Sequence, residues 1–213
     1  LDSLDTSLQR LGTDHLDLWL VQAPDGHTPL AETLSALRTA VASGRSRYVG
    51  LSNYPAWQVA RAATMLESDD TFLTATQVEY SLLQRGVERE LVPAAIACGV
   101  GVLAWSPLGR GVLSGKYRRS VPADSRGASP HLRGFVEPYL TDSARSVVEA
   151  VATAADGLGR SPVEVALAWV RDAPGVAAAV VGARSPAQLR GSLAATDLEL
   201  PEQIRSVLDE VTQ

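Results

Sequence analysis

The sequence is poor in cysteine and lacks long apolar runs. Cys98 is the single cysteine among 213 residues, so no disulfide can form within them, and such sparing use of cysteine is typical of a reducing compartment. No apolar run approaches the roughly 20 residues that a membrane-spanning helix needs, and no secretory signal pattern is visible. We therefore expect a cytoplasmic protein with no membrane partner. Within its apolar segment, PAAIACGVGVLAW, we expect Cys98 to be inert core filler.

Positive charge is also scarce. The 19 Lys and Arg residues are outnumbered by 24 Asp and Glu residues, which gives a formal net charge of -5. A surface of this sign does not attract nucleic acid or an anionic membrane, so small molecules or proteins are the expected partners. We predict no metal site. The hydrophobic content of 46 % is enough for the core of a single domain over residues 1–213.

Apolar runs alternate with helical patterns along the whole chain. The predicted strands are residues 16–21, 47–53, 73–81, 100–107 and 176–183. Helices are predicted over residues 30–44, 55–68 and 87–99, in two stretches after about residue 138, and from Ser185 and Pro201. Five strand–helix units result, and this alternation implies a parallel sheet with right-handed crossovers.

The lack of a glycine-rich turn decides between two layouts of such a sheet. An open doubly wound sheet would carry G-x-G-x-x-G after its first strand, and no strand-to-helix junction here has that pattern. A (β/α)8 barrel fits better, and it needs eight strands in about 250 residues. We therefore expect this chain to cover roughly strands 4 to 8, with three units upstream of Leu1. Since five strands alone leave two open edges, we also expect an oligomer or a second chain to cover them.

Polar side chains follow the predicted strands. The active site of a barrel forms at the carboxyl ends of its strands, so the residues at these exits are candidates. They are Gln22, Ser52, Asn53, Gln77, Trp105, Ser106, Gly182, Ala183 and Arg184. Amides and hydroxyls around one mouth could bind a flat polar ring, and a tryptophan offers a face for stacking. Ser52 or Asn53 alone would indicate a helix cap, but the exits together favour a site.

Five segments of the chain resemble the landmarks of one enzyme family, in that family's order. They are RLGTDHLDLWLVQAP, VGLSN, TQVEYSLLQRGVE, AWSPLGRGVLSGKY and VVGARSPAQLRGSL. The chain resembles the aldo-keto reductase superfamily, and most closely its bacterial members with the GARSP signature, a branch that also resembles potassium-channel β subunits. The resemblance implies a (β/α)8 TIM barrel of aldo-keto reductase type, here without its N-terminal third. It also implies a bound nicotinamide cofactor, preferentially NADPH, without a Rossmann domain.

The resemblance implies a position for each part of the cofactor. Ser52, Asn53 and Gln77 would hold the nicotinamide carboxamide, and Trp105 would stack on the ring. The pyrophosphate would be wrapped by the backbone of Ser106, Pro107, Leu108, Gly109, Arg110 and Gly111. The adenosine 2′-phosphate, at the start of a helix, would be held by Gly182, Ala183 and Arg184. Contacts on the adenine side would come from Gln188 and Ser192.

Two departures from the family pattern affect function. Family members usually carry Glu and Asn where this sequence has Gly191 and Ser192, which weakens the adenine contacts. Of the family's catalytic Asp, Tyr, Lys and His, only the histidine position falls within this chain, and Gln22 occupies it. A glutamine can donate a hydrogen bond to a carbonyl oxygen but cannot titrate. Lys116, the only lysine, is expected to be solvated, and its neighbour Tyr117 is expected to face elsewhere.

Two functions of different class follow from these residues. The first is an NADPH-dependent reductase of a small aldehyde or ketone, with Gln22 as the catalytic residue in this chain and the tyrosine upstream of Leu1. The alternative is an NADPH-binding sensor or partner subunit with little or no turnover. A truncated barrel that persists only by association is a third possibility. Residues 109–138 would form a mobile belt over the pyrophosphate, and Trp19 and Trp57 are expected to be packing residues.

Overall fold

The five predicted strands are all present in the computed structural model, which describes residues 1–69 and 71–212. They are β1 (Leu16–Val21), β2 (Ser46–Ser52), β3 (Leu73–Glu79), β4 (Gly101–Trp105) and β5 (Val176–Val180). Their order in the sheet is β1-β2-β3-β4-β5, and β1 pairs in parallel with β2, as β2 does with β3. The prediction of an α/β fold with a parallel sheet is therefore confirmed.

The chain divides into two compact units. The first comprises Leu1–Val78 and Val87–Leu103, and the second comprises Glu79–Gly86 and Ala104–Gln213. β3 and β4 each begin in the first unit and end in the second.

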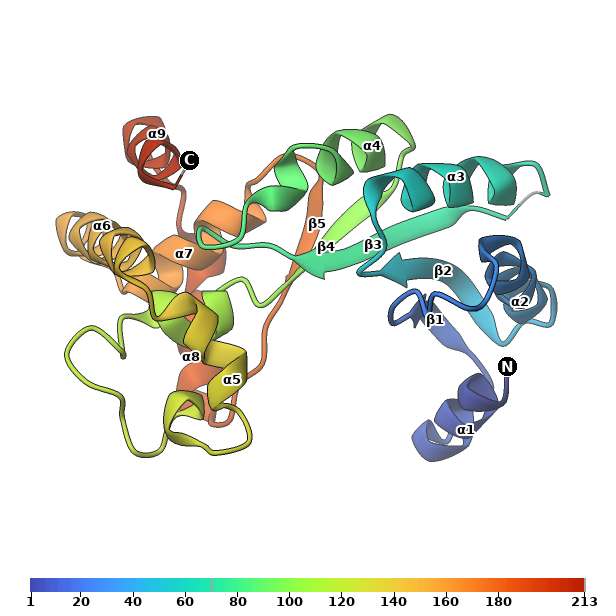
Figure 1. Ribbon diagram of the computed structural model, residues 1–213, viewed down its shortest axis with the longest axis horizontal. Coiled ribbons are helices and arrows are strands. Elements are labelled where there is room, and N and C mark those ends of the chain that lie inside the picture. The colour runs from blue at the N-terminus through green and yellow to red at the C-terminus, as the bar shows by residue number, and fades with distance from the viewer. Residues whose placement is uncertain (70, 213) are drawn as a thin grey trace. The chain divides into compact units, whose positions relative to one another are not determined.

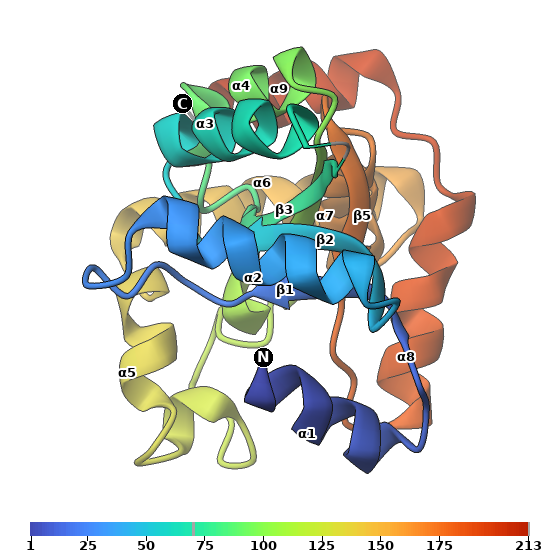
Figure 2. The same ribbon diagram turned by 90° about the vertical axis from the view of Figure 1, so that its right-hand side faces the viewer.

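The first unit packs helices on the sheet through leucine-rich faces. Its helices are α1 (Asp2–Leu11), α2 (Leu30–Ala42), α3 (Ala56–Glu67) and α4 (Leu91–Ala97). α3 and α4 lie side by side (Figure 1), and α2 lies along β2 (Figure 2). Leu34 and Leu37 of α2 are fully buried, as are Val49 and Leu51 of β2. The face of α2 that the sequence predicts to be apolar is thus the face that packs.

Three predictions in this unit are wrong. α4 begins at Leu91 and not at residue 87, because Pro93 lacks an N–H group and is tolerated only in the first turn of a helix. Trp57 is 59 % exposed, since it lies off the buried stripe of α3. Cys98 is exposed at the carboxyl end of α4 and is not core filler. Trp19 does pack, against the buried cluster of Leu4, Leu8 and Ala40.

The second unit is built around α7. Its helices are α5 (Arg133–Val136), α6 (Asp142–Leu158), α7 (Pro162–Arg171), α8 (Pro186–Leu193) and α9 (Glu202–Val211). Every residue of α7 from Glu164 to Val170 is buried, and a capping box of Ser161 and Glu164 starts the helix. The rings of Trp169 and Tyr80 are in T-shaped contact, with 5.6 Å between their centroids, and Trp169 Nε1 donates to Asp209 of α9 at 3.0 Å.

The stretch predicted as a loop, residues 109–138, contains short helical turns. They are η2 (Gly109–Ser114), η3 (Arg126–Ala128) and the four-residue α5. Across the part of the chain that the structure describes, no helix has the length and apolarity needed to traverse a bilayer.

Candidate functional site

Hydroxyl and amide side chains gather at the carboxyl ends of β1, β2 and β3. Ser52, the last residue of β2, pairs in register with Gln77 of β3. Its hydroxyl, on a side chain that is almost fully buried, donates to the backbone oxygen of Gln77 at 3.0 Å. The side-chain Nδ2 of Asn53 donates to Ser52 Oγ at 3.1 Å and to the backbone oxygen of Gln22 at 3.0 Å. The backbone N–H of Asn53 donates to the backbone oxygen of Gln77 at 2.9 Å. All four residues predicted from these strand exits are therefore brought together.

One donor of this cluster is accessible to a ligand. The Gln77 side chain is half-buried, and its Oε1 receives only a long contact of 3.4 Å from Ser52 Oγ. Its Nε2 finds no hydrogen-bond partner within residues 1–69 and 71–212. Gln77 Nε2 is not among the buried polar atoms of the described residues that lack a partner, so it is open to solvent and can donate to a ligand oxygen placed against the strand ends.

Gln22 lies at the exposed start of the loop after β1. Asp25 holds this loop by accepting the N–H groups of His27 and Thr28 and the Thr28 hydroxyl. These hydrogen bonds, the Thr28 hydroxyl first, lower the pKa of Asp25 to about 2. The carboxylate therefore stays ionised at neutral pH and holds the turn at residues 25–28, while the backbone oxygen of Gln22 is held by Asn53.

Backbone strain also marks the predicted residues. Among the described residues, the non-glycine positions with a left-handed φ are Asn53 at 61°, Ser106 at 51° and Arg110 at 58°. This conformation costs an L-residue about 1–2 kcal/mol, somewhat less for asparagine. Such strain concentrates at functional sites, and all three positions belong to the set predicted from the sequence.

The loop after β4 folds on itself in the second unit. Gly109 (φ 53°) and Gly111 (φ 95°) are left-handed, and their N–H groups donate to the Ser106 and Leu108 carbonyls at 2.8 and 2.9 Å. A β-carbon on Gly109 would lie 2.7 Å from Leu83 Cδ1, so a larger residue would require the Leu83 side chain to move, and glycine is favoured there. The glycines thus serve turn geometry, and these two N–H groups are already engaged within the loop.

Arg110 fastens the same loop through its side chain. Its Nε and one terminal nitrogen each donate to a Glu79 carboxylate oxygen at 2.7 Å, and its other terminal nitrogen donates to the Phe135 carbonyl at 2.6 Å. The guanidinium also lies 4.0 Å from the Phe135 ring centroid and 4.9 Å from that of Tyr139. Hydrogen bonding to Glu79 raises the pKa of Arg110 above its ordinary value. Burial and then the Glu79 charge raise the pKa of Tyr139 to about 12.

Sequence reasoning missed Glu79 and Lys116. Glu79 ends β3 two residues after Gln77, and the two-residue alternation of a strand would have selected it. Lys116 is exposed, as predicted, but its ammonium lies 5.0 Å from the Tyr117 ring centroid, so the expectation that these neighbours face apart is wrong. A β-carbon on Gly111 would lie 3.1 Å from Lys116 Nζ, which places this cation beside the loop after β4.

The segment after β5 carries a second basic group. Residues 181–190 are exposed. The Arg184 N–H donates to Gln188 Oε1 at 2.8 Å, and Ser185 Oγ caps α8 by accepting the Gln188 N–H at 3.3 Å. The Arg184 guanidinium donates to the Asp124 carbonyl at 3.1 Å and so joins this segment to the predicted belt. Ser192, by contrast, lies in the last turn of α8 and is half-buried.

The predicted cofactor residues are shared between the two units. Gln22, Ser52, Asn53 and Gln77 belong to the first, and Trp105 and the residues at 106–111 and 182–192 belong to the second. Trp105 ends β4, is half-buried, and accepts the Tyr80 N–H at its carbonyl at 3.2 Å. Within the described residues, no three His, Cys, Asp or Glu side chains gather as a metal site would require.

Comparison with known proteins gives concordant matches over the whole chain. Residues 1–213 match the Aldo/keto reductase family. An uncharacterized oxidoreductase of Bacillus subtilis, YrpG, is 36 % identical over 98 % of this chain. A probable voltage-gated potassium channel subunit beta of Arabidopsis thaliana is 32 % identical over 100 % of it, and the L-glyceraldehyde 3-phosphate reductase of Escherichia coli O157:H7 is 34 % identical over 92 %. The chain spans 62, 66 and 57 % of the lengths of these three relatives. The resemblance noted in the motifs is confirmed.

Proposed function

Because the chain belongs to the aldo/keto reductase family, we propose that the protein takes part in the NADPH-dependent reduction of an aldehyde or ketone to an alcohol. The observation that carries this proposal is the cluster of Ser52, Asn53 and Gln77 at the strand ends, in which the side-chain amide of Gln77 is open to solvent and can be reached by a ligand. A bound nicotinamide would supply the hydride, and the chain would supply its orientation.

The donor set of the first unit suits a carboxamide. Gln77 Nε2 can donate to the carboxamide oxygen, and the bond between Ser52 Oγ and the Gln77 backbone holds the strand ends in place. The left-handed turn at Asn53 directs its side-chain amide to the backbone oxygen of Gln22 at the end of β1. A carboxamide fixed by such groups orients its ring relative to the substrate carbonyl, which is the contribution expected from positioning.

Two cations of the second unit suit the phosphates. Arg110 is engaged by Glu79, so we propose that Lys116, beside Gly111, supplies the positive charge near the pyrophosphate. Arg184 is exposed at the start of α8, where the helix dipole adds to the attraction of an anion. A guanidinium at this position favours a 2′-phosphate and therefore NADPH over NADH.

Gln22 occupies the position of the family's catalytic histidine, and this replacement suggests a second function. The side-chain amide of Gln22 can donate a hydrogen bond to a substrate oxygen but cannot act as an acid or a base at neutral pH. We therefore also propose an NADPH-binding sensor or partner subunit with little turnover. Binding and reduction separate the two proposals.

The first experiment is a titration of the purified protein with NADPH and with NADH, followed by tryptophan fluorescence. We expect quenching at lower concentrations of NADPH than of NADH. Trp105→Phe should remove most of the quenching, whereas Trp57→Phe, which changes a tryptophan that is 59 % exposed on α3, should preserve it. Equal quenching in the two variants would contradict the role of Trp105, and no quenching with either cofactor would contradict the site.

The second experiment measures turnover. Loss of NADPH absorbance is followed in the presence of 4-nitrobenzaldehyde. Saturable loss that disappears in Gln77→Ala supports a reductase, whereas NADPH binding without such loss supports the sensor or partner subunit.

A further inference from the structure

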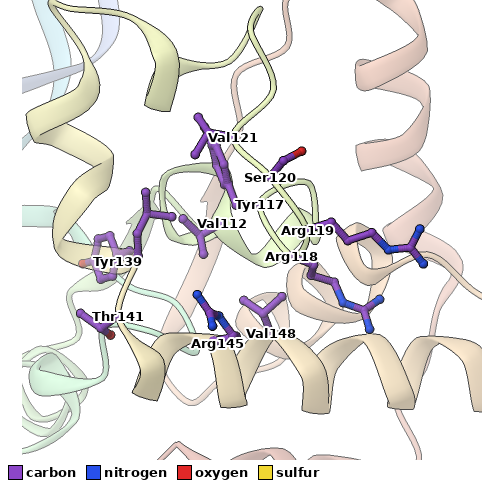
Figure 3. Close-up of a pocket in the computed structure, with 11 residues that line it drawn as sticks. Val112, Tyr117, Arg118, Arg119, Ser120, Val121, Tyr139, Thr141, Arg145 and Val148 are labelled. Carbon is purple, nitrogen blue, oxygen red and sulfur yellow. The ribbon is translucent and has the colours of Figure 1, made fainter.

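A cavity of about 220 Å³ lies in the second unit, among residues that the cofactor proposal does not use. It is open to solvent on one side and is lined by residues 117–121, by the first turns of α6, and by Val112 and Tyr139 (Figure 3). A dry cavity of about 150 Å³ already holds a benzene ring, so this volume admits a small organic molecule.

The lining of the cavity is cationic. Arg118, Arg119 and Arg145 contribute to it, and no carboxylate does. Figure 3 shows the Arg145 guanidinium next to Val112 in the middle of the view, whereas Arg118 and Arg119 extend to one side. Arg118 is engaged by Glu149, and Arg119 has no ion-pair partner in the part of the chain that the structure describes. The charge of Arg118 is thus offset, and the charges left to the cavity are those of Arg119 and of Arg145, which lies next to Val112 in Figure 3.

Arg145 is only loosely held by the protein. Its nearest carboxylate is that of Asp142, one turn earlier on α6, at 3.7 Å, and the two side chains are 66 and 99 % exposed. Pairs this exposed contribute little, so an anion with better geometry can replace Asp142. A guanidinium offers a phosphate or carboxylate two parallel N–H donors, which an aspartate contact at 3.7 Å does not use.

The rest of the lining supplies an apolar wall and further donors. Val112 and Val148 are buried against the cavity, and the Tyr139 ring forms another side. Thr141 is the N-cap residue of α6, so the amino end of a 17-residue helix, whose dipole favours an anion, opens at the same place. An apolar wall beside a cationic end is the arrangement that a ligand of mixed character requires.

We propose that this cavity binds a small organic anion with a compact apolar body. The anionic group would lie on Arg145 at the amino end of α6, and the apolar body would lie against Val112, Val148 and Tyr139. The site does not depend on the cofactor proposal, because Arg145, Val148 and Tyr139 are not assigned to the cofactor, although residues 117–121 also belong to the predicted belt.

Isothermal titration of the purified protein with phenyl phosphate tests the proposal, with inorganic phosphate as the probe that lacks the apolar body. We expect one phenyl phosphate per chain and binding at least tenfold tighter than that of inorganic phosphate. Arg145→Gln should weaken phenyl phosphate roughly tenfold or more, since a charge-assisted hydrogen bond is lost. Arg145 is a surface side chain, so its replacement leaves the fold intact.

Arg133→Gln is the matched control, because it removes the same charge from an exposed arginine of α5 that does not line the cavity. Its affinity for phenyl phosphate should equal that of the unmodified protein. Equal losses in Arg145→Gln and Arg133→Gln would overturn the proposal, as would equal affinities for phenyl and inorganic phosphate or no saturable binding. Weakening by Lys116→Gln but not by Arg145→Gln would place the ligand at the loop after β4 and would also overturn it.

Discussion

Removing the carboxylate charge of Glu79 tests whether the Glu79–Arg110 pair fastens the loop after β4. The pair is bidentate at 2.7 Å, and its side chains are only 11 and 16 % exposed. Losing one partner of a buried pair costs about 3–5 kcal/mol, because the other charge stays buried without compensation. Arg110 keeps its bond to the Phe135 carbonyl and its contacts with two rings, so we expect Glu79→Gln to lower the free energy of unfolding by about 3 kcal/mol.

Urea denaturation followed by far-UV circular dichroism measures this loss. With an m-value of about 3 kcal/mol/M, near the upper end of the usual range, the midpoint should fall by about 1 M. Glu149→Gln is the matched control. Glu149 also pairs with an arginine, Arg118, but the two side chains are 48 and 40 % exposed, so its loss should shift the midpoint far less than that of Glu79.

A double-mutant cycle isolates the pair itself. Arg110→Met keeps an unbranched apolar stem between the rings but removes the charge, and Glu79→Gln in that background should then cost about 2 kcal/mol less than it does alone. Two results would refute the reasoning. One is a loss in Glu79→Gln no larger than that in Glu149→Gln, and the other is strict additivity of Glu79→Gln and Arg110→Met.

Three further predictions concern single positions. Gly109→Ala should lower the thermal midpoint, because the left-handed φ at this position costs an alanine about 1–2 kcal/mol and the added β-carbon would meet Leu83. The control is Gly157→Ala: Gly157 lies in open space on α6, so this change should raise the free energy of unfolding by about 0.5–1 kcal/mol. Hydrogen bonds from the backbone and then the hydroxyl of Ser161 lower the pKa of Glu164 from 4.5, so its contribution to stability is present above pH 4.5 and is lost as the pH falls through the lowered value. Glu164→Gln should therefore flatten this part of the curve of unfolding free energy against pH. An unchanged curve would contradict the capping role. Arg184→Ala should weaken NADPH about 10–100-fold in the fluorescence titration and leave NADH unchanged, and equal weakening of both would contradict a 2′-phosphate contact.

Local patterns in the sequence predicted the strands well and the packing of individual side chains less well. β1 has the predicted bounds, and Gln22, Ser52, Asn53 and Gln77 meet because parallel strands bring their carboxyl ends to one edge. The pairing of Glu79 with Arg110 could not be predicted, since it joins residues 31 positions apart and depends on the path of the intervening chain.

The errors in the start of α4 and in the burial of Trp57 also arise from features that a local sequence pattern does not specify. The pattern of residues 87–99 allowed a long helix, but the start of α4 is set by the single Pro93. Whether Trp57 is buried depends on the rotation of α3 against its neighbours, which the composition of the helix does not specify.

The three non-glycine residues with a left-handed φ destabilise the backbone, but two of them make hydrogen bonds that a glycine could not make. Glycine would relax the backbone at Asn53, Ser106 and Arg110, yet it would remove the bonds that Asn53 makes to Gln22 and Ser52 and that Arg110 makes to Glu79. The Ser106 side chain makes no hydrogen bond within the described residues. In a library selected only for folding, glycine should therefore accumulate at position 106 and not at 53 or 110. If serine persists at position 106 under selection for activity, its hydroxyl would be kept for a role in activity and not for stability.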